Sequence, residues 1–377
     1  MTALYKGLTW DHPRGFNALD RAGRESGLIQ WDKQPLEGFE SAPIGDLCAE
    51  YDLVVLDHPH LGEALALGCL QPLELVFDAE DLARIARATI GACFRSYTMN
   101  GQQWGLPLDA ATQVMAWRPE LVDQSVETWQ DVTEYARRSG KVALSLAGPH
   151  AFLSLLSIAA SLDGSLDLGD CGWLSSDLCE RAFEQLAEVQ AFANTATQNL
   201  NPIEILETMS SDTAIAVCPL IYGYVNYSAR PAQASVAFRD APRADPGGRI
   251  GSILGGTGIG ISTRSPVDNA LRDHLLWLMD DAAQSEFMPA NDGQPSARAA
   301  WQASGVNEGV RDFYKATSQT LEQATLRPRH NGYIAFQSAA SRAVRDALAA
   351  RENAALVAHN LSDMFDASLP RTGKETA

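Results

Sequence analysis

Short apolar strands that alternate with helices are the feature that most constrains the fold of this chain. Tyr51–Leu56 is a near-continuous apolar run, which is typical of a strand buried on both faces of a sheet. Strand patterns over Leu4–Trp10 and Leu28–Lys33 precede it, with a helical pattern over Phe16–Ser26 between them. Strands that alternate with helices predict an α/β fold with a parallel, doubly wound sheet.

The rest of the chain continues the same α/β pattern. Gly105–Asp109 predicts a kink between two strand segments, and Ser265 followed by Pro266 predicts the start of a helix, after which the chain is mostly helical. We further expect helices over residues 79–90, 128–139, 150–162 and 177–193, and strands over residues 101–117, 214–222 and 250–262. A chain of 377 residues is long enough for two lobes or domains.

The charge balance excludes several kinds of partner. The formal net charge is -18, so the surface repels phosphate backbones and anionic lipids. The densest basic stretch, Arg327–His330, is too short to reverse this, and no uninterrupted apolar run approaches the length of a membrane span. We therefore expect no nucleic-acid partner and no membrane insertion.

The beginning of the chain predicts its location. It has neither the apolar segment nor the small-residue cleavage site of a secretory signal. The sequence as encoded therefore predicts a cytoplasmic protein, and a periplasmic one only if a signal sequence has been removed.

The six cysteines are scattered and form no C-x-x-C motif. This spacing does not support a zinc or redox site, and it favours free thiols that are mostly buried. The residues concerned are Cys48, Cys69, Cys93, Cys171, Cys179 and Cys218.

A glycine-rich segment, Gly255–Gly260, invites comparison with a phosphate-binding loop. The lysine-containing pattern of such a loop is absent, and the segment continues as a strand rather than as a helix. Glycines that let the backbone approach a ligand or a neighbouring strand explain it better.

The tripeptide Asp-His-Pro occurs twice, at Asp11–Pro13 and Asp57–Pro59, each time directly after a predicted strand. Ligand crevices of open α/β sheets lie at the carboxyl ends of strands, so neighbouring first and third strands would bring His12 and His58 to one crevice. Such a site could coordinate a metal, bind a sugar hydroxyl or transfer protons. The alternative is that each residue only caps its loop.

The other histidines carry less information. His150, His274 and His359 lie in helical stretches and are most simply core or surface residues, whereas His330 lies in a loop beside two arginines. The chain contains no G-x-S-x-G motif of a serine nucleophile.

An ordered series of segments resembles family 1 of the bacterial extracellular solute-binding proteins, the sugar-binding components of ABC transporters. The segments share the order and spacing of that family's strand, crossover and helix motifs, such as Gly-Leu-Pro-Leu-Asp in the crossover and Thr-Trp at the start of a helix. They are Tyr51–Leu73, Gly101–Trp117, Thr128–Ala136, Ala214–Tyr222, Gly255–Ser262 and Trp277–Arg298.

This resemblance implies a periplasmic-binding-protein-like fold of type II, in which two α/β lobes, each a mostly parallel sheet flanked by helices, enclose a ligand cleft. The lobes would be discontinuous: residues 1–108 with 255–310, and residues 109–254 with 311–377. The resemblance places in the cleft Trp10, Asp11, His12, Asp57, His58, Asp109, Tyr222, Gly255, Gly256, Thr257 and Arg298.

Two functions from different classes follow. The first is a solute-binding protein that holds a small polar organic ligand, either sugar-like or a carboxylate, between its lobes and passes it to an ABC permease if it is exported. It needs no cofactor.

The second function is a cytosolic enzyme built on the same fold, and the sequence does not decide between the two. Its catalytic histidines would act as acid and base, with a neighbouring aspartate to orient them. The candidates are His12, His58 and His60 with Asp11, Asp57 and Asp109. A divalent metal at His12 and His58, in an enzyme or a sensor, is a third alternative.

Overall fold

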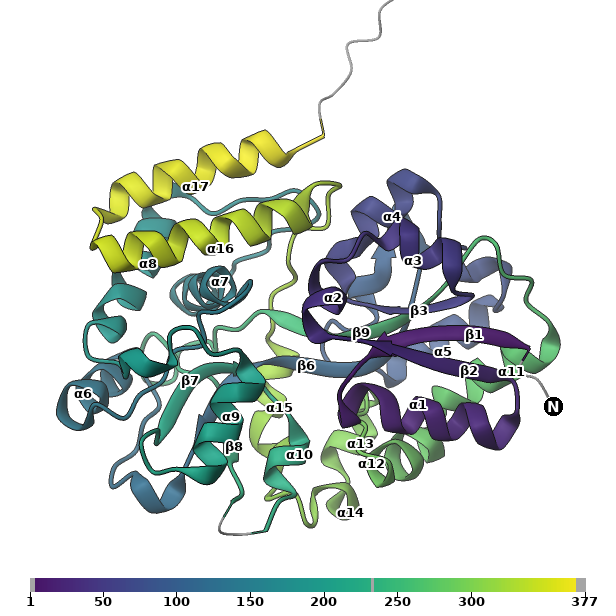
Figure 1. Cartoon of the computed structure of the whole chain (residues 1–377), viewed down its shortest axis with the longest axis horizontal. Coiled ribbons are helices and arrows are strands. Elements are labelled where there is room, and N and C mark those ends of the chain that lie inside the picture. The colour runs from purple at the N-terminus through teal and green to yellow at the C-terminus, as the bar shows by residue number, and fades with distance from the viewer. Residues whose placement is uncertain (1–3, 232–233, 371–377) are drawn as a thin grey trace, which may run out of the picture.

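The computed structural model describes residues 4–231 and 234–370, and its seven-stranded mixed sheet passes through both halves of the molecule. Figure 1 shows two lobes side by side, with β6 running from one into the other. The sheet order is β2-β1-β3-β9-β6-β7, and β8 also pairs with β6. The strands are β1 (Tyr5–Trp10), β2 (Ile29–Gln34), β3 (Leu53–Leu56), β6 (Leu106–Trp117), β7 (Val217–Tyr222), β8 (Ala237–Arg239) and β9 (Leu254–Ile261).

Lobe 1, on the right of Figure 1, is built around β1, β2, β3 and β9. β1 pairs in parallel with both β2 and β3, which confirms that the first and third predicted strands are neighbours. β9 is antiparallel to β3, so the sheet is mixed rather than wholly parallel. The main helices of this lobe are α1 (Pro13–Ser26), α2 (Leu36–Ser41), α3 (Ile44–Glu50), α4 (Leu61–Leu67), α5 (Ala79–Ala88) and α11 (Asn269–Leu278).

Lobe 2, on the left, contains the second half of β6 with β7 and β8, and both of these strands pair with β6 in the antiparallel sense. This differs from the mostly parallel sheet that we expect in each lobe. Helix α7 is enclosed along almost its whole length and contacts both α8 and α16. The helices are α6 (Trp129–Ser139), α7 (His150–Leu162), α8 (Ser176–Gln190), α9 (Pro202–Ser211), α10 (Val225–Ser228), α16 (Tyr333–Ala350) and α17 (Ala354–Ser368).

Two long strands join the lobes. The first half of β6 pairs with β9 from Leu106 to Thr112, and its second half pairs with β7 and β8 from Gln113 onward. The predicted kink is therefore a register shift between Pro107 and Asp109 inside one continuous strand. The predicted lobe boundaries at 108/109 and 254/255 fall within β6 and at the start of β9, and the exact division stays a prediction.

Between the lobes, at the bottom of Figure 1, lie α13 (Arg298–Gln302), α14 (Ser304–Asn307) and α15 (Phe313–Glu322). Helix α15 contacts β6, β8 and α13. The remaining short elements are β4 (Thr98–Met99), β5 (Gln102–Gln103), α12 (Met288–Ala290), a π-helix at Ala283–Phe287, and 3-10 turns at His58–His60, Leu73–Leu75, Arg95–Tyr97, Pro119–Leu121 and Thr195–Thr197.

Capping residues determine where the helices begin. α6 starts after Thr128, whose side chain and that of Asp131 satisfy each other's backbone N–H groups. The predicted helix start at Ser265 is wrong, because α11 begins at Asn269 with Asp268 as its N-cap. The Asp268 carboxylate accepts the Leu271 N–H at 2.8 Å, whereas the Ser265 carbonyl accepts the side-chain amide of Gln71.

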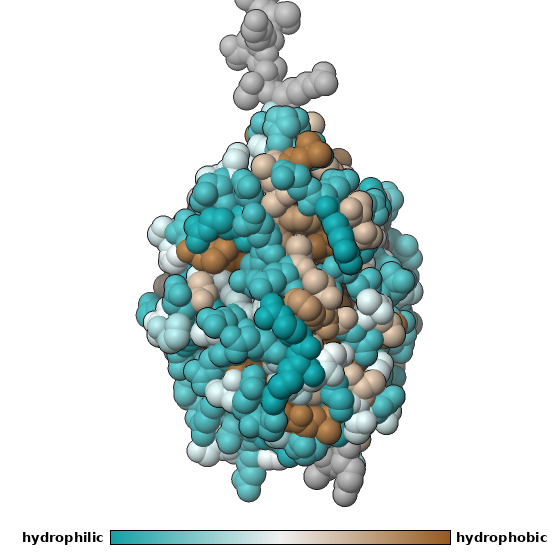
Figure 2. All heavy atoms as spheres, turned by 90° about the vertical axis from the view of Figure 1, so that its left-hand side faces the viewer, coloured by the Kyte–Doolittle hydropathy of each residue, from teal (hydrophilic) through white to brown (hydrophobic). Residues whose placement is uncertain are grey.

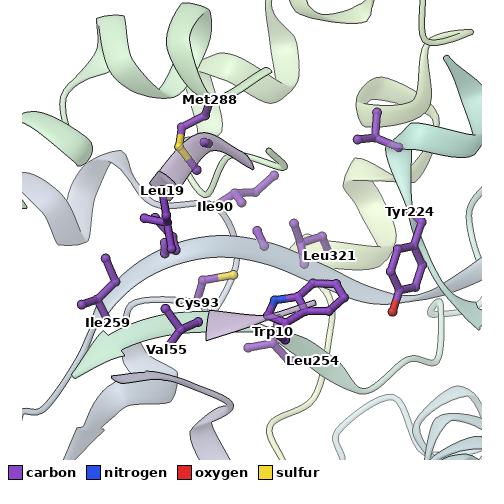
Figure 3. Close-up of a cluster of buried hydrophobic side chains, with 14 of the residues drawn as sticks. Trp10, Leu19, Val55, Ile90, Cys93, Tyr224, Leu254, Ile259, Met288 and Leu321 are labelled. Atoms are coloured by element: carbon purple, nitrogen blue, oxygen red, sulfur yellow. The ribbon is translucent and has the colours of Figure 1, made fainter. Parts of the chain in front are cut away.

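The hydrophobic core continues from lobe 1 toward the other lobe. Figure 3 shows part of it, with Trp10 on β1 and Tyr224 after β7 in the same cluster. The outer face of lobe 2 is mostly hydrophilic, and its apolar groups form small separate patches (Figure 2). Among the helices of the described residues, none combines the length and apolarity that crossing a bilayer requires.

Candidate functional site

A cavity lies between the lobes, beside the carboxyl ends of β1 and β3. Its volume is about 60 Å³, smaller than the about 150 Å³ of a cavity that holds benzene. A ligand with a sugar ring therefore requires the lobes to separate from this arrangement. The residues that line it include Trp10, Arg14, Leu36, Phe39, Glu40, Asp57, His60, Ala111, Pro149, His150, Leu153, Tyr222, Tyr224, Gly255, Gly256, Thr257, Arg327, Ile334 and Gln337.

A buried ion pair between Asp57 and Arg327 forms one wall. Asp57 directly follows β3 and accepts the His58 N–H at 2.8 Å, while Arg327 pairs with its other carboxylate oxygen. The same guanidinium donates to the side-chain oxygen of Gln337 on α16 at 3.1 Å, so it connects the two lobes. Burial alone would raise the pKa of the Asp57 carboxyl, but the charge of Arg327 and the His58 hydrogen bond hold that pKa far below its usual value.

A second buried pair, Arg14 with Asp109, lies at the crossing of β6. Arg14 on α1 donates from Nε to Asp109 at 2.7 Å, and its Nη1 donates to the carbonyl of Gly223 at 2.9 Å. The guanidinium carbon also lies 5.0 Å from the ring centre of Tyr224. Because Arg14 comes from lobe 1 and Gly223 follows β7 of lobe 2, this pair stabilises the junction of the lobes.

Aromatic rings continue the wall from Trp10. The His12 ring stacks on Trp10 with centres 5.2 Å apart and meets Tyr224 edge-on at 4.9 Å. His12 is the N-cap of α1, and its Nδ1 accepts the Arg14 N–H at 3.1 Å. Burial, followed by the charge of Arg14, lowers the pKa of His12 to about 4, so this ring is neutral at pH 7.

Five buried polar atoms on cavity-lining residues have no hydrogen-bond partner within the described residues. They come from both lobes and from the segment between α15 and α16, and each can donate a hydrogen bond in a suitable tautomer or rotamer. They are Nε1 of Trp10, Nδ1 of His60, Nδ1 of His150, Oη of Tyr222 and Nε of Arg327. Because burying such groups unpaired costs free energy, they mark positions for ligand or solvent hydrogen bonds.

Seven of the residues predicted from the sequence line this cavity, and they come from four separated parts of the chain. They are Trp10, Asp57, His60, Tyr222, Gly255, Gly256 and Thr257.

The glycines act as the sequence indicates, by allowing close backbone approach. A Cβ atom on Gly255 would lie 2.4 Å from the Tyr222 ring. Gly256 has a φ of +88°, and a Cβ atom there would lie 2.3 Å from the carbonyl oxygen of Asp109. Larger residues would displace the wall of the cavity at both positions.

The other predicted site residues lie outside the cavity wall as the described residues form it. Asp11 is exposed and pairs with Lys33 at 2.7 Å. Arg298 on α13 pairs with Glu322 on α15 at 2.7 Å, which fastens two helices to each other. Asp109 is occupied by Arg14, so its carboxylate is structural.

His58 is buried in lobe 1 and is 1% exposed. Its Nδ1 lies 3.1 Å from Asp57, and its Nε2 accepts the backbone N–H of Arg327 at 3.4 Å. Burial and the charge of Arg327 lower the pKa of this imidazole to about 4. With both ring nitrogens engaged, His58 positions the Asp57 segment. Neither His58 nor His12, whose ring stacks on Trp10, is among the residues that line the cavity.

The described residues contain no group of three or more histidine, cysteine, aspartate or glutamate side chains that could hold a metal ion. The His12 Nδ1 is used in the helix cap and both His58 nitrogens are used around Asp57, so these two rings are poorly placed to share a metal.

Several cavity residues were not predicted from the sequence. Glu40 lies in a segment to which the sequence assigns no element, and His150 lies at the start of a predicted helix; the two side chains approach to 3.5 Å. Arg327 and Gln337 come from the last third of the chain, and only the Arg-Pro-Arg-His stretch in a loop drew attention to that region. Tyr224 is two residues beyond the predicted Tyr222.

No protein-family model matches the sequence, and no curated protein matches it either. Solved structures do match along nearly the whole chain. The GacH receptor of Streptomyces glaucescens, studied unliganded and with acarbose, has a TM-score of 0.79 at 12% identity, covering 98% of this chain and 99% of that chain.

Two further structures extend this comparison. Maltose-bound MalE3 of T. maritima has a TM-score of 0.76 at 16% identity, covering 97% of this chain and 99% of that chain. An ABC transporter solute-binding protein of Agrobacterium radiobacter K84, in complex with ribitol, has a TM-score of 0.73 at 16% identity, covering 97% of this chain and 98% of that chain. The chain therefore has the two-lobe α/β fold of sugar-type ABC-transporter solute-binding proteins, as the resemblance in its sequence predicts.

Proposed function

We propose that this chain is a solute-binding protein whose lobes close on a small, uncharged, hydroxyl-rich ligand, a monosaccharide or a short polyol. The observation that carries the proposal is the cavity itself, in which unpartnered polar atoms lie beside an apolar wall. A sugar offers both donors and acceptors around its edge and C–H groups on its faces, so it matches a wall of this kind. Trp10, Leu36 and Phe39 supply the apolar part of the lining.

The charges of the site favour an uncharged ligand over a carboxylate. Arg327 is paired with Asp57, and Arg14 is paired with Asp109. Each cationic group is therefore already neutralised, and Glu40 adds a further negative charge to the lining. Among the described residues that line the cavity, a carboxylate would meet no arginine that lacks a carboxylate partner, and Glu40 would repel it. Hydroxyl groups, in contrast, can donate hydrogen bonds to Glu40.

Because the cavity is too small for a sugar ring as the lobes stand, the proposal includes lobes that move apart to admit the ligand and close around it. The segments that connect the lobes are few, so a small dihedral change in them can separate the walls. The fold is shared with the ribitol complex of an ABC transporter solute-binding protein. Transfer of the ligand to an ABC permease completes the proposal, and loss of ligand uptake when the gene is deleted tests that part.

Calorimetric titration of the purified chain tests the proposal directly. The panel contains ribitol, D-mannitol, D-tagatose, maltose and, as the charged competitor, gluconate. We expect at least one monosaccharide or polyol to bind and gluconate to bind far more weakly. Binding of gluconate as tightly as its uncharged relatives would overturn the assignment of ligand class.

A variant series locates the binding site. Tyr222→Phe removes a hydroxyl that lines the cavity and has no protein partner, so ligand affinity should fall by about 1 kcal/mol or more while folding is retained. The matched control is Tyr135→Phe, since Tyr135 donates its hydroxyl to the carbonyl of Leu121 in lobe 2. Equal affinities in both variants would place the ligand elsewhere.

A further inference from the structure

Two cysteines of lobe 1 meet in a small core that is separate from the ligand cavity. Cys48 lies on α3 and is 3% exposed, and Cys69 follows α4 and is partly exposed. Cys48 belongs to the apolar cluster between these helices, and Cys69 packs against that cluster. The helices α3 and α4 pack against each other here, and the two thiols are close enough to shift each other's pKa although they are 21 positions apart in the sequence.

The backbone around both cysteines is fixed by the same short segment after β9. Arg264 donates a hydrogen bond to the carbonyl of Ala49 at 2.6 Å, and the N–H of Thr263 donates to the carbonyl of Cys69 at 3.0 Å. The helices also approach closely, since a Cβ atom on Gly45 would lie 2.7 Å from the Leu67 side chain. The two sulfurs are therefore held together by the fold rather than meeting by chance motion.

We propose that Cys48 and Cys69 form a reversible intramolecular disulfide by exchange with a small-molecule disulfide such as oxidised glutathione. The Cys69 thiol loses its proton and attacks one sulfur of the oxidant, giving a mixed disulfide and releasing one glutathione thiolate, which takes up a proton. Cys48 then loses its proton and attacks the Cys69 sulfur, which displaces the second glutathione. Two protein thiols are oxidised, and one disulfide is reduced to two thiols.

The order of these steps follows from the surroundings of the two thiols. Cys69 is the more accessible partner, and its interaction with the Cys48 thiol lowers the pKa of its own thiol. Cys48 is enclosed, and both its interaction with the Cys69 thiol and burial raise the pKa of its thiol. Cys69 is thus the attacking thiol, and Cys48 is the resolving one.

The disulfide would close a ring that contains a wall of the ligand cavity. Residues 48–69 include β3, Asp57, His60 and α4. Crosslinking the ends of this segment restricts the unfolded chain and stabilises the wall in the folded one. The inference does not depend on the identity of the ligand, because neither sulfur lies among the residues that line the cavity.

The remaining cysteines give internal controls. Cys179 and Cys218 are buried, and burial raises the pKa of each thiol to about 12. Cys171 is exposed and would react with the oxidant alone, so the test uses the full chain with Cys171→Ala throughout.

In the experiment, the folded protein is incubated with oxidised glutathione and then mapped by mass spectrometry after alkylation of the free thiols. We expect a peptide pair linked through Cys48 and Cys69, with the loss of two alkylatable thiols. With Cys48→Ala added, we expect a stable glutathione adduct on Cys69. With Cys69→Ala added, we expect Cys48 to stay unmodified.

Two results would overturn the proposal: a glutathione adduct that persists on Cys69 while Cys48 is intact, or no modification of either residue in the folded protein. Both are read in the protein that keeps Cys48 and Cys69, so they do not depend on the folding of the further variants. The linked form should also melt about 4 °C above the reduced form, from the loop-closure entropy and the unfolding entropy of a chain of this size. An unchanged or lower melting temperature in the linked form would contradict the closed ring as a stabilising element.

Discussion

Replacing Arg327 by methionine tests the central electrostatic feature of the cavity. The variant removes the guanidinium that pairs with Asp57 and keeps an unbranched side chain of similar reach. The Asp57 side chain is 19% exposed, so its carboxylate would remain largely buried, with the backbone N–H and the ring Nδ1 of His58 as its remaining partners. Leaving one member of a buried ion pair uncompensated costs about 3–5 kcal/mol.

The cost should be near the lower end of that range, about 3 kcal/mol, because Asp57 keeps some contact with solvent and both of its contacts with His58. Urea unfolding at pH 7.5, followed by tryptophan fluorescence, measures it as a lower midpoint. The same measurement on Asp57→Asn and on the double variant gives the coupling energy of the pair. We expect the double variant to be more stable than the sum of the two single losses predicts.

The pH dependence of the free energy of unfolding gives an independent check that the Asp57–Arg327 pair stabilises the folded protein. The pKa of Asp57 is depressed in the folded protein, so the pair contributes stability above the ordinary aspartate pKa and loses it as the pH falls below that value. The difference between the parent chain and Arg327→Met should therefore shrink in acid. Additive single losses, or a loss below 1 kcal/mol with no dependence on pH, would refute the claim that this pair holds the wall together.

Three further predictions concern acid stability, the glycine wall and lobe closure. Burial lowers the pKa of both His58 and His60 to about 4, so between pH 6.5 and 4 the unfolded chain binds more protons than the folded one. Urea titrations should therefore show the free energy of unfolding decreasing as the pH falls from 6.5 to 4, by up to about 3 kcal/mol per ring. A free energy of unfolding that does not change across this window would contradict the burial of these rings. Gly255→Ala should displace Tyr222 and lower the free energy of unfolding by about 1–3 kcal/mol. Gly305→Ala is the control, because a Cβ atom there meets no atom within 4 Å. Equal unfolding midpoints for the two variants would count against the close approach of Gly255 to the Tyr222 ring. Solution scattering should show a smaller radius of gyration with bound ligand than without it, and identical curves at confirmed saturation would argue against closure.

The elements of the fold were largely predictable because their signals are local. β3 appears as an apolar run, and α6 begins at a Thr-Trp step whose capping residue is visible in the sequence. The antiparallel direction of β9 was not predictable in the same way, because it depends on how distant parts of the chain pair in the sheet. β9 pairs with β3 and β6, and neither strand is next to it in the sequence. The start of α11 shows a local limit, since Ser265 and Asp268 are both good N-caps and the contact between Gln71 and the Ser265 backbone favours the second.

The cavity was half predictable for a related reason. The end of β3 carries Asp57 and His60 into it, and a strand end is visible in the sequence. Arg327 reaches the same place from the other end of the chain, and nothing in its own neighbourhood indicates a carboxylate partner 270 positions away. A charge that is to be buried must find such a partner, but the basic stretch Arg327–His330 does not indicate which distant carboxylate that partner will be.

The two Asp-His-Pro motifs show how one local pattern can give two different structural roles. In the first, His12 caps α1 and stacks on Trp10, while Asp11 stays in solvent with Lys33. In the second, Asp57 turns into the cavity because Arg327 compensates its charge, and His58 is enclosed by the segment that carries Arg327. The tripeptide specifies only a turn after a strand. Asp57 can face the cavity because Arg327 compensates its charge there, whereas Asp11 has only the exposed Lys33 as its partner.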